Sequence, residues 1–252
     1  MRPMPLPARD IYTQEGEVSL GLLIEAAELE ALRIELDAWA KDAPVNAYGL
    51  LYHNLWQVLP GFRCLVENGR LAQSLMTLLQ IPEIRLFQDN LVCKLPGNPT
   101  EIQWHQDYSY WPLDRPAGIT AWLALDDTDA ENGAMWHIPG SHHWGERAPT
   151  DFIQGSKQPL LPGLPPMDPE GRPRMLASAQ AGELRVHHPL NWHRSGPNLS
   201  HRPRRAWTTT WILPEVCWAP AHAPHPYLWS LSPEQGKALS DFPTFASATQ
   251  TV

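Results

Sequence analysis

The segment Trp104-His105-Gln106-Asp107 places an imidazole and a carboxylate two residues apart. On a β-strand, residues i and i+2 point to the same face, roughly 7 Å apart along the backbone. His105 and Asp107 can therefore both reach one metal ion, while Gln106 points away. A second histidine would complete a 2-His-1-carboxylate facial triad, the ligand set of non-haem Fe(II) sites, which leaves three coordination positions open for a co-substrate and O₂.

The best candidate for the third ligand is His193, which lies in the segment 191–198 (NWHRSGPN). Its neighbours His187 and His188 are the rival histidines, and a buried core histidine is the simpler alternative for any of them. His188 precedes a proline, which favours a structural position for it. Ser195 follows His193 by two residues and is expected to face the same way.

His193 is followed by a predicted turn and then by a strand that begins with two arginines. Residues 196–198 (GPN) and 201–203 (HRP) are of types that favour turns, so the chain should reverse direction there. An arginine on the returning strand would then lie near His193, and strand alternation lets only one of Arg204 and Arg205 point inward. Its planar fork could bind a carboxylate. The alternative is a solvated charge in a basic turn.

The elements that must position these residues change character along the chain. Helical periodicity predicts amphipathic helices over 22–41 and 69–80. Short strand-like runs separated by turn residues follow, which predicts an all-β sandwich or barrel behind N-terminal helices. These runs are 84–94, 119–125, 134–138, 182–188 and 206–213. Residues 148–180 are rich in Pro and Gly and lack periodicity, so we expect a long loop that serves as a lid.

Composition narrows the class of protein. The chain has 252 residues, 43% hydrophobic and 18% charged, which supports a sizeable core. A formal net charge of -8 argues against nucleic-acid binding, and no run approaches the ~20 apolar residues of a membrane span. The N-terminus does not resemble a signal peptide. Three widely spaced cysteines favour free thiols, so a soluble cytoplasmic protein is expected.

Five blocks of sequence together resemble the phytanoyl-CoA dioxygenase family of Fe(II)/2-oxoglutarate oxygenases. With the N-terminal helices they cover most of residues 17–213, in the family's order and spacing. The blocks are 85–97 (RLFQDNLVCKLPG), 104–112 (WHQDYSYWP), 122–127 (WLALDD), 132–142 (NGAMWHIPGSH) and 193–198 (HRSGPN). The resemblance implies a double-stranded β-helix (jelly roll, cupin-like). It also implies a single domain over 1–252, with a helical part over 17–82, a core over 84–213 and a Pro-rich tail over 214–252.

The resemblance also implies roles for residues. Iron would bind His105, Asp107 and His193. The far carboxylate of 2-oxoglutarate would pair with Arg204, which the family spacing selects over Arg205, helped by Ser195. The other two positions that would contact the co-substrate are Lys94 and Trp122. The implied reaction consumes O₂ and 2-oxoglutarate, releases succinate and CO₂, and hydroxylates a small molecule. Related halogenases carry a small residue where this chain has Asp107, so the carboxylate favours hydroxylation.

Several assignments stay open at this level. Aromatic residues that could line a substrate pocket, or pack in the core, are Tyr108, Tyr110, Trp111 and Trp136. Of Trp136 and His137, one should face the pocket and the other the core. Residues expected to be structural or solvated are His142, His143, Asp126, Asp127, Asp129, His222 and His225. The aromatic content favours an apolar, aromatic or cationic substrate, and the oligomeric state is left open.

Two other functions compete with the oxygenase. The first is a cupin-like isomerase or hydrolase that uses a divalent ion as a Lewis acid. It would work without O₂ and would not need Arg204. The second is a binding module that keeps the fold but does no chemistry. An intact set of metal ligands, together with Ser195 and Arg204, disfavours this second alternative.

Overall fold

Helices dominate the first part of the chain in the computed structural model, which describes residues 7–43, 51–150, 164–166, 168–219, 236–237 and 247–249. The helices are α1 (Pro7–Glu15), α2 (Ala26–Ala40), α3 (Leu55–Val58), α4 (Pro60–Glu67) and α5 (Arg70–Leu79). The predicted helices over 22–41 and 69–80 correspond to α2 and α5. The first was predicted too long at its start, because Leu22 ends a strand.

Among the described residues, the larger of two antiparallel sheets has seven strands. Along the sheet these are β1 (Glu17–Leu22), β8 (Glu183–His187), β5 (Gly118–Ala124), β10 (Arg204–Ile212), β3 (Glu83–Lys94) and β11 (Ser247–Thr249), and β2 (Leu51–His53) also pairs with β3. Strands β3, β5, β8 and β10 match predicted runs. The region expected to be helical over 17–82 also contributes two strands, β1 and β2, to this sheet.

The smaller sheet has four strands in the order β4 (Ile102–His105), β9 (His193–Ser195), β6 (Met135–His137) and β7 (Met175–Ala177). Two short 3-10 helices, η1 (Asp107–Tyr110) and η2 (Ser141–Trp144), follow β4 and β6. Strand β7 lies inside the segment 148–180, which is therefore not a continuous loop. Residues 151–163 and 167 of that segment lie outside the described residues, so its role as a lid stays a prediction.

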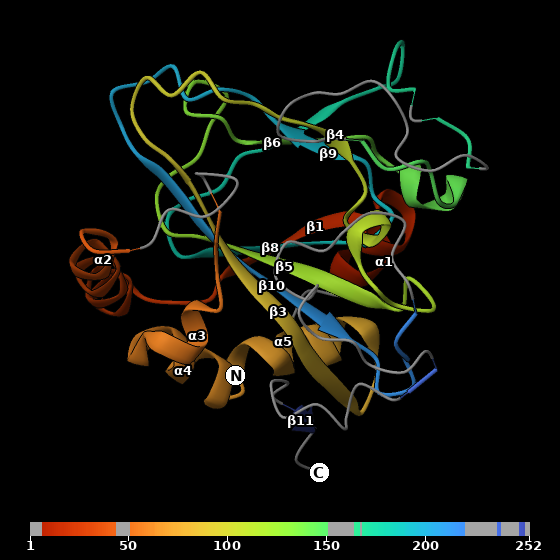
Figure 1. The fold of residues 1–252 in the computed structure, drawn as a ribbon, viewed down its shortest axis with the longest axis horizontal. Coiled ribbons are helices and arrows are strands. Elements are labelled where there is room, and N and C mark those ends of the chain that lie inside the picture. The colour runs from red at the N-terminus through yellow and green to blue at the C-terminus, as the bar shows by residue number, and fades with distance from the viewer. Residues whose placement is uncertain are drawn as a thin grey trace.

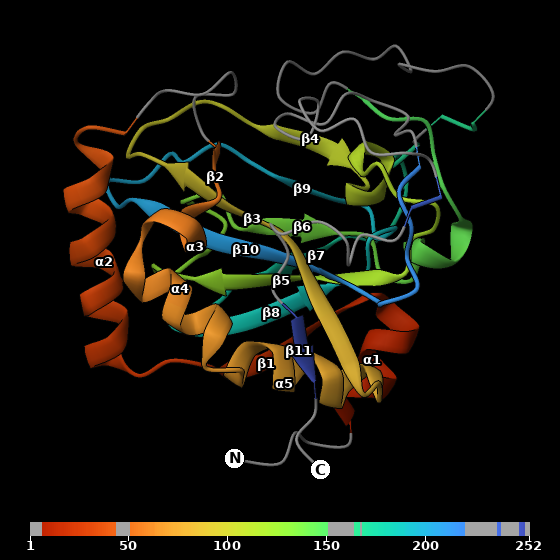
Figure 2. The same cartoon turned by 60° about the horizontal axis from the view of Figure 1, so that its bottom comes forward.

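Helices cover one face of the larger sheet, and the smaller sheet lies over the other (Figures 1 and 2). Strand alternation explains this arrangement. On β10, Trp207 and Trp211 are fully buried on the helix side, and Trp207 meets Phe62 of α4 edge to face with ring centroids 5.2 Å apart. Thr208 and Thr210 point the other way, into a cavity between the sheets. The two facing antiparallel sheets form the expected jelly roll.

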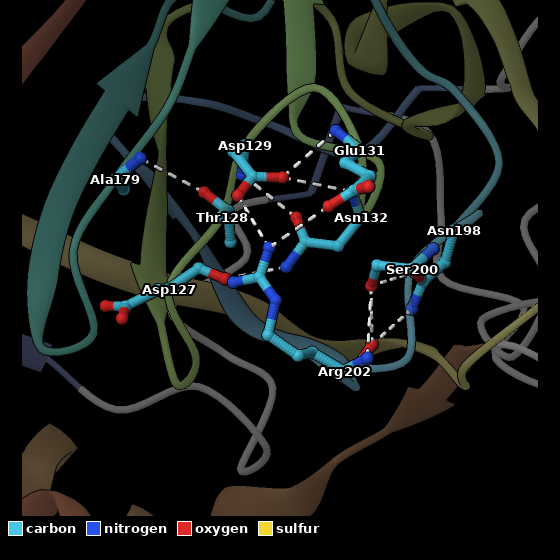
Figure 3. A network of polar contacts seen from close by, with 9 residues as sticks. All are labelled: Asp127, Thr128, Asp129, Glu131, Asn132, Ala179, Asn198, Ser200 and Arg202. Atoms are coloured by element: carbon cyan, nitrogen blue, oxygen red, sulfur yellow. Dashed lines mark hydrogen bonds and ion pairs between the residues drawn. The ribbon is translucent and has the colours of Figure 1, made fainter.

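A polar network ties the loop after β5 to the loop between β9 and β10 (Figure 3). Arg202 donates to Asp129 at 2.7 Å, and the Asn132 amide donates to the carbonyl of Asp127 at 2.7 Å. The Asn198 amide donates to the carbonyls of Lys94, at 3.0 Å, and Arg202, at 2.7 Å. The network holds the end of the cavity where β10 begins.

Candidate metal centre and adjoining cavity

Three predicted ligands converge at one end of the cavity. The ligand atoms of His105, Asp107 and His193 all lie within 4.8 Å of one another. Asp107 Oδ1 is 3.6 Å from Nε2 of His105 and 3.4 Å from Nε2 of His193. Strand β4 ends at His105, and Asp107 begins η1 rather than continuing the strand. Gln106 between them is extended (φ -112°, ψ 133°), so both side chains still face the cavity.

Both histidines are oriented by backbone carbonyls. Nδ1 of His105 donates to the carbonyl of Gln103 at 2.7 Å, and Nδ1 of His193 donates to that of Asn191 at 2.9 Å. Because a carbonyl can only accept, each Nδ1 carries a hydrogen, which leaves each Nε2 as the nitrogen that can bind a metal. Histidine ligands are usually oriented in this way by a partner behind the ring.

The Asp107 carboxylate is ionised. Burial alone would raise its pKa, but the electrostatic effect of His193 and the hydrogen bond from His187 hold the pKa well below its usual range. Burial lowers the pKa of His105, with His193 adding to the effect. One carboxylate with two imidazole nitrogens suits a divalent transition metal.

His187 was considered in the sequence only as a rival of His193, and its position was not predicted. It lies behind Asp107, with Nε2 2.9 Å from Oδ2, and Thr120 donates to the same oxygen at 2.8 Å. Burial lowers the pKa of His187, and His193 lowers it further. Thr120 and His187 are register partners on β5 and β8, and no local signal could have joined them to Asp107.

Arg204, Ser195 and Trp122 all line the same cavity. Arg204 is 2% exposed, and its Nη2 donates to the carbonyl of Gly133 at 2.8 Å. Its Nε and Nη1, and Oγ of Ser195, are buried without a partner among the described residues. Burial lowers the pKa of Arg204 to about 10, so it remains charged at neutral pH. A buried cation with unpaired donors beside a hydroxyl fits a carboxylate ligand.

Arg205 points to the opposite side of β10. Its Nε and its backbone N–H both donate to Asp126 at 2.9 Å. Asp126 is 8% exposed, which corrects the expectation that it belongs to a solvated acidic loop. Because side chains alternate along a strand, Arg204 points into the cavity, whereas its neighbour Arg205 forms an ion pair on the other side of the sheet.

Lys94 is the predicted co-substrate residue that the structure places elsewhere. Its buried Nζ donates to the carbonyls of Thr100 (3.1 Å), Ser195 (3.2 Å) and Gly196. It is not among the residues that line the cavity. Burial, together with the nearby charge of Arg204, lowers its pKa to about 7. Its three donors are used by the backbone, so Lys94 supports the turn after β9 instead of facing a ligand.

The four candidate substrate residues divide into two pairs. Tyr110 and Trp111 line the cavity, and their contact with a substrate stays a prediction. Tyr108 does not line the cavity; it packs in an apolar cluster that also contains Trp111, and it donates to the carbonyl of Leu113 at 3.0 Å. Trp136 does not line the cavity, because strand alternation on β6 turns Met135 inward in its place. Its neighbour His137 is buried, 3.8 Å from the Glu17 carboxylate.

The empty space of the cavity, which includes open solvent, is about 950 Å³. The polar lining residues that were not predicted include Gln88, Asn90, Thr208 and Thr210. They occupy alternate positions on β3 and β10, a period-2 pattern that could have identified them. His142 and His143 bond the carbonyl of Thr13 and are structural, as expected. His222 and His225 lie outside the described residues.

A jelly roll with two histidines and one carboxylate at one end of its cavity defines a cupin-like metal-binding protein. The chain belongs to the phytanoyl-CoA dioxygenase (PhyH) family, whose sequence model matches residues 22–206. It is 30% identical over 185 residues to phytanoyl-CoA dioxygenase 1 of Oryza sativa subsp. japonica, covering 71% of this chain and 61% of that protein.

Two further proteins are similar. The chain is 31% identical over 147 residues to a probable alpha-ketoglutarate-dependent hypophosphite dioxygenase of Stutzerimonas stutzeri, covering 56% of this chain and 49% of that protein. It therefore spans less than two thirds of the length of either curated relative. The crystal structure of the non-heme alpha ketoglutarate dependent carbocyclase SnoK shares its fold, with a TM-score of 0.79, 21% identity, and coverage of 97% of this chain and 96% of SnoK.

Proposed function

We propose that the chain is an Fe(II)- and 2-oxoglutarate-dependent oxygenase that hydroxylates a small molecule and releases succinate and CO₂. The observation that carries this proposal is one cavity with two complementary sites. His105, Asp107 and His193 form a metal site, and Arg204 and Ser195 offer unpaired buried donors to a carboxylate. When bound, the iron and the keto acid would supply the electrons needed to activate O₂.

The chain's own residues would divide the binding task. The Nε2 atoms of both histidines and the Asp107 carboxylate would hold the ion. Arg204 would pair with the far carboxylate of 2-oxoglutarate, with the Ser195 hydroxyl as a further donor. Trp122 lies beneath the guanidinium, whose carbon is 5.4 Å from the ring centroid, and would keep it in place. A divalent ion, Asp107, a dianionic keto acid and Arg204 sum to zero charge, which favours their burial together.

Asp107 favours hydroxylation over halogenation, because its carboxylate occupies the position that a halide would need. A competing isomerase or hydrolase that uses the metal as a Lewis acid would not need the buried Arg204. A guanidinium buried with unpaired donors is costly, and a carboxylate ligand offsets that cost. The buried arginine is therefore the feature that favours the oxygenase.

The substrate and the setting are also proposals. Tyr110 and Trp111 favour an apolar, aromatic or cationic small molecule. A reducing, cytoplasmic setting is supported by Cys64, Cys93 and Cys217, which are all free thiols. No helix in the described part of the chain is long and apolar enough to cross a membrane. We also propose a single domain, because the helices and the larger sheet share one hydrophobic core.

The deciding experiment is an anaerobic titration of the metal-free protein with Fe(II) and 2-oxoglutarate, followed by visible absorption. We expect a metal-to-keto-acid charge-transfer band in the wild type that disappears in His193→Ala. The control His143→Ala, outside the cavity lining, should keep the band. If the wild type binds Fe(II) without a band, 2-oxoglutarate is not chelated and the Lewis-acid alternative takes precedence.

A further inference from the structure

We propose that His187 is a positioning residue that, together with Thr120, makes Asp107 a metal ligand through one oxygen only. This inference rests on the proposed function, because it concerns the same metal site. It adds a residue that the facial triad does not include. His187 would act on the metal only through the Asp107 carboxylate.

The two oxygens of Asp107 have different neighbours. Oδ1 faces both histidine ligands, at 3.6 Å from His105 and 3.4 Å from His193. Oδ2 accepts hydrogen bonds from His187 at 2.9 Å and from Thr120 at 2.8 Å. Since an ionised carboxylate only accepts, Nε2 of His187 must carry the hydrogen. The geometry therefore directs one oxygen to the metal and occupies the other with donors.

The support behind Oδ2 is built into the middle of the larger sheet. Thr120 on β5 and His187 on β8 are register partners, flanked by β10 and β1. Both are buried, with exposures of 4% and 2%. Nδ1 of His187 has no partner among the described residues. Among its described contacts, this buried imidazole makes one hydrogen bond, to Asp107. Its position on a strand inside the sheet restricts the movement of the ring.

Monodentate binding has a consequence for the open metal positions. A carboxylate free to rotate can chelate with both oxygens and thereby fill one further coordination position. Two hydrogen bonds to Oδ2 oppose that rotation, because chelation would break both. His187 and Thr120 therefore preserve the open positions that the co-substrate and O₂ require.

The test measures anaerobic Fe(II) affinity of the metal-free protein, without 2-oxoglutarate, in position 187 variants. His187→Leu removes the donor, and outer-sphere partners of this kind typically change metal affinity by about 10- to 100-fold. We expect a loss in that range. His187→Gln restores an amide donor and should stay within about threefold of the wild type. His188→Gln is the matched control, since His188 is the next residue and makes no contact with Asp107, and it should bind Fe(II) normally.

Unfolding temperatures of the metal-free variants separate positioning from packing. If His187→Leu does not fold, the near-isosteric Thr120→Val decides, and it should weaken Fe(II) binding in the same direction. The inference is overturned if the folded variant binds Fe(II) as the wild type does, or if His187→Gln is as weak as His187→Leu. Failure of the proposed function would be distinct, because the wild type would then bind Fe(II) yet show no charge-transfer band with 2-oxoglutarate.

Discussion

Arg204 and Arg205 are adjacent in the chain and have opposite environments. Arg204 lies in the cavity with two unpaired nitrogens, whereas Arg205 is held by Asp126 and Asp37. The Asp126 pair raises the pKa of Arg205 further above its already high usual value. Side-chain direction, and not residue type, therefore decides which arginine can bind a ligand.

Replacement of each arginine by lysine should separate these roles. Arg204→Lys keeps a positive charge but loses the planar fork, so 2-oxoglutarate affinity should fall by about tenfold or more. Fe(II) affinity should be unchanged. Arg205→Lys should leave both affinities intact and lower the free energy of unfolding by about 1 kcal/mol. The measurements are charge-transfer titrations and urea unfolding. Equal loss of 2-oxoglutarate binding in both variants would contradict the assignment.

At the scale of elements, the site depends on how closely the loops after β5 and β9 approach each other. Gly133 has φ +86°, and its carbonyl accepts from Arg204. A Cβ placed there would lie 2.7 Å from the carbonyl oxygen of Gly196 and 3.0 Å from that of Pro197. Both contacts are with backbone, which cannot move without shifting the turn that follows Ser195.

Gly133→Ala should therefore weaken 2-oxoglutarate binding more than Fe(II) binding. Gly97→Ala is the matched control, because Gly97 also has positive φ (+70°) but nothing lies within 4 Å of its added Cβ. The free energy of unfolding of the control should fall by only about 1 kcal/mol, the cost of holding a non-glycine residue at positive φ. Gly133→Ala should lose at least about 2 kcal/mol more. Urea unfolding and both titrations check this. Equal destabilisation by the two variants would show that the close approach is unimportant.

At the scale of the molecule, an imidazole cluster docks α1 on the β core. His188 follows β8 and packs against Tyr12 of α1 and His142 of η2, with ring centroids 6.4 and 5.0 Å apart. Nδ1 of His188 accepts from the backbone N–H of Leu190 at 3.1 Å, so the ring is neutral. Burial lowers its pKa to about 3, and neighbouring histidines, His142 first, contribute.

This cluster should make the protein acid-sensitive. A folded pKa below the unfolded value of about 6.5 means that the unfolded state binds the proton more readily. The stabilisation by neutral His188 is therefore complete above pH 6.5 and is lost as pH falls from there towards 3. Between pH 7.5 and 5 we expect a loss of about 2 kcal/mol from this residue. Urea unfolding at both pH values should show a smaller difference in His188→Gln than in wild type. An equal difference would exclude His188 as a cause.

The sequence by itself determined the elements and residues whose signals are local. The His-x-Asp spacing and the turn after His193 predicted the candidate metal site, and the short strand-like runs that correspond to β3, β5, β8 and β10 predicted most of the larger sheet. Elements without a strong local pattern were missed. Helix α3 has four residues, and β1 shows no alternating burial. Strand β1 pairs with β8, a partner about 165 residues away in the chain.

Only the tertiary structure decided which face of each element meets the cavity and which donors are already used. Met135 replaces Trp136 in the lining, Lys94 is occupied by three carbonyls, and His187 supports Asp107 from a strand 80 residues away. Each outcome depends on partners distant in the chain. Hydrogen-bond satisfaction is a property of the assembled neighbours, which local spacing does not encode.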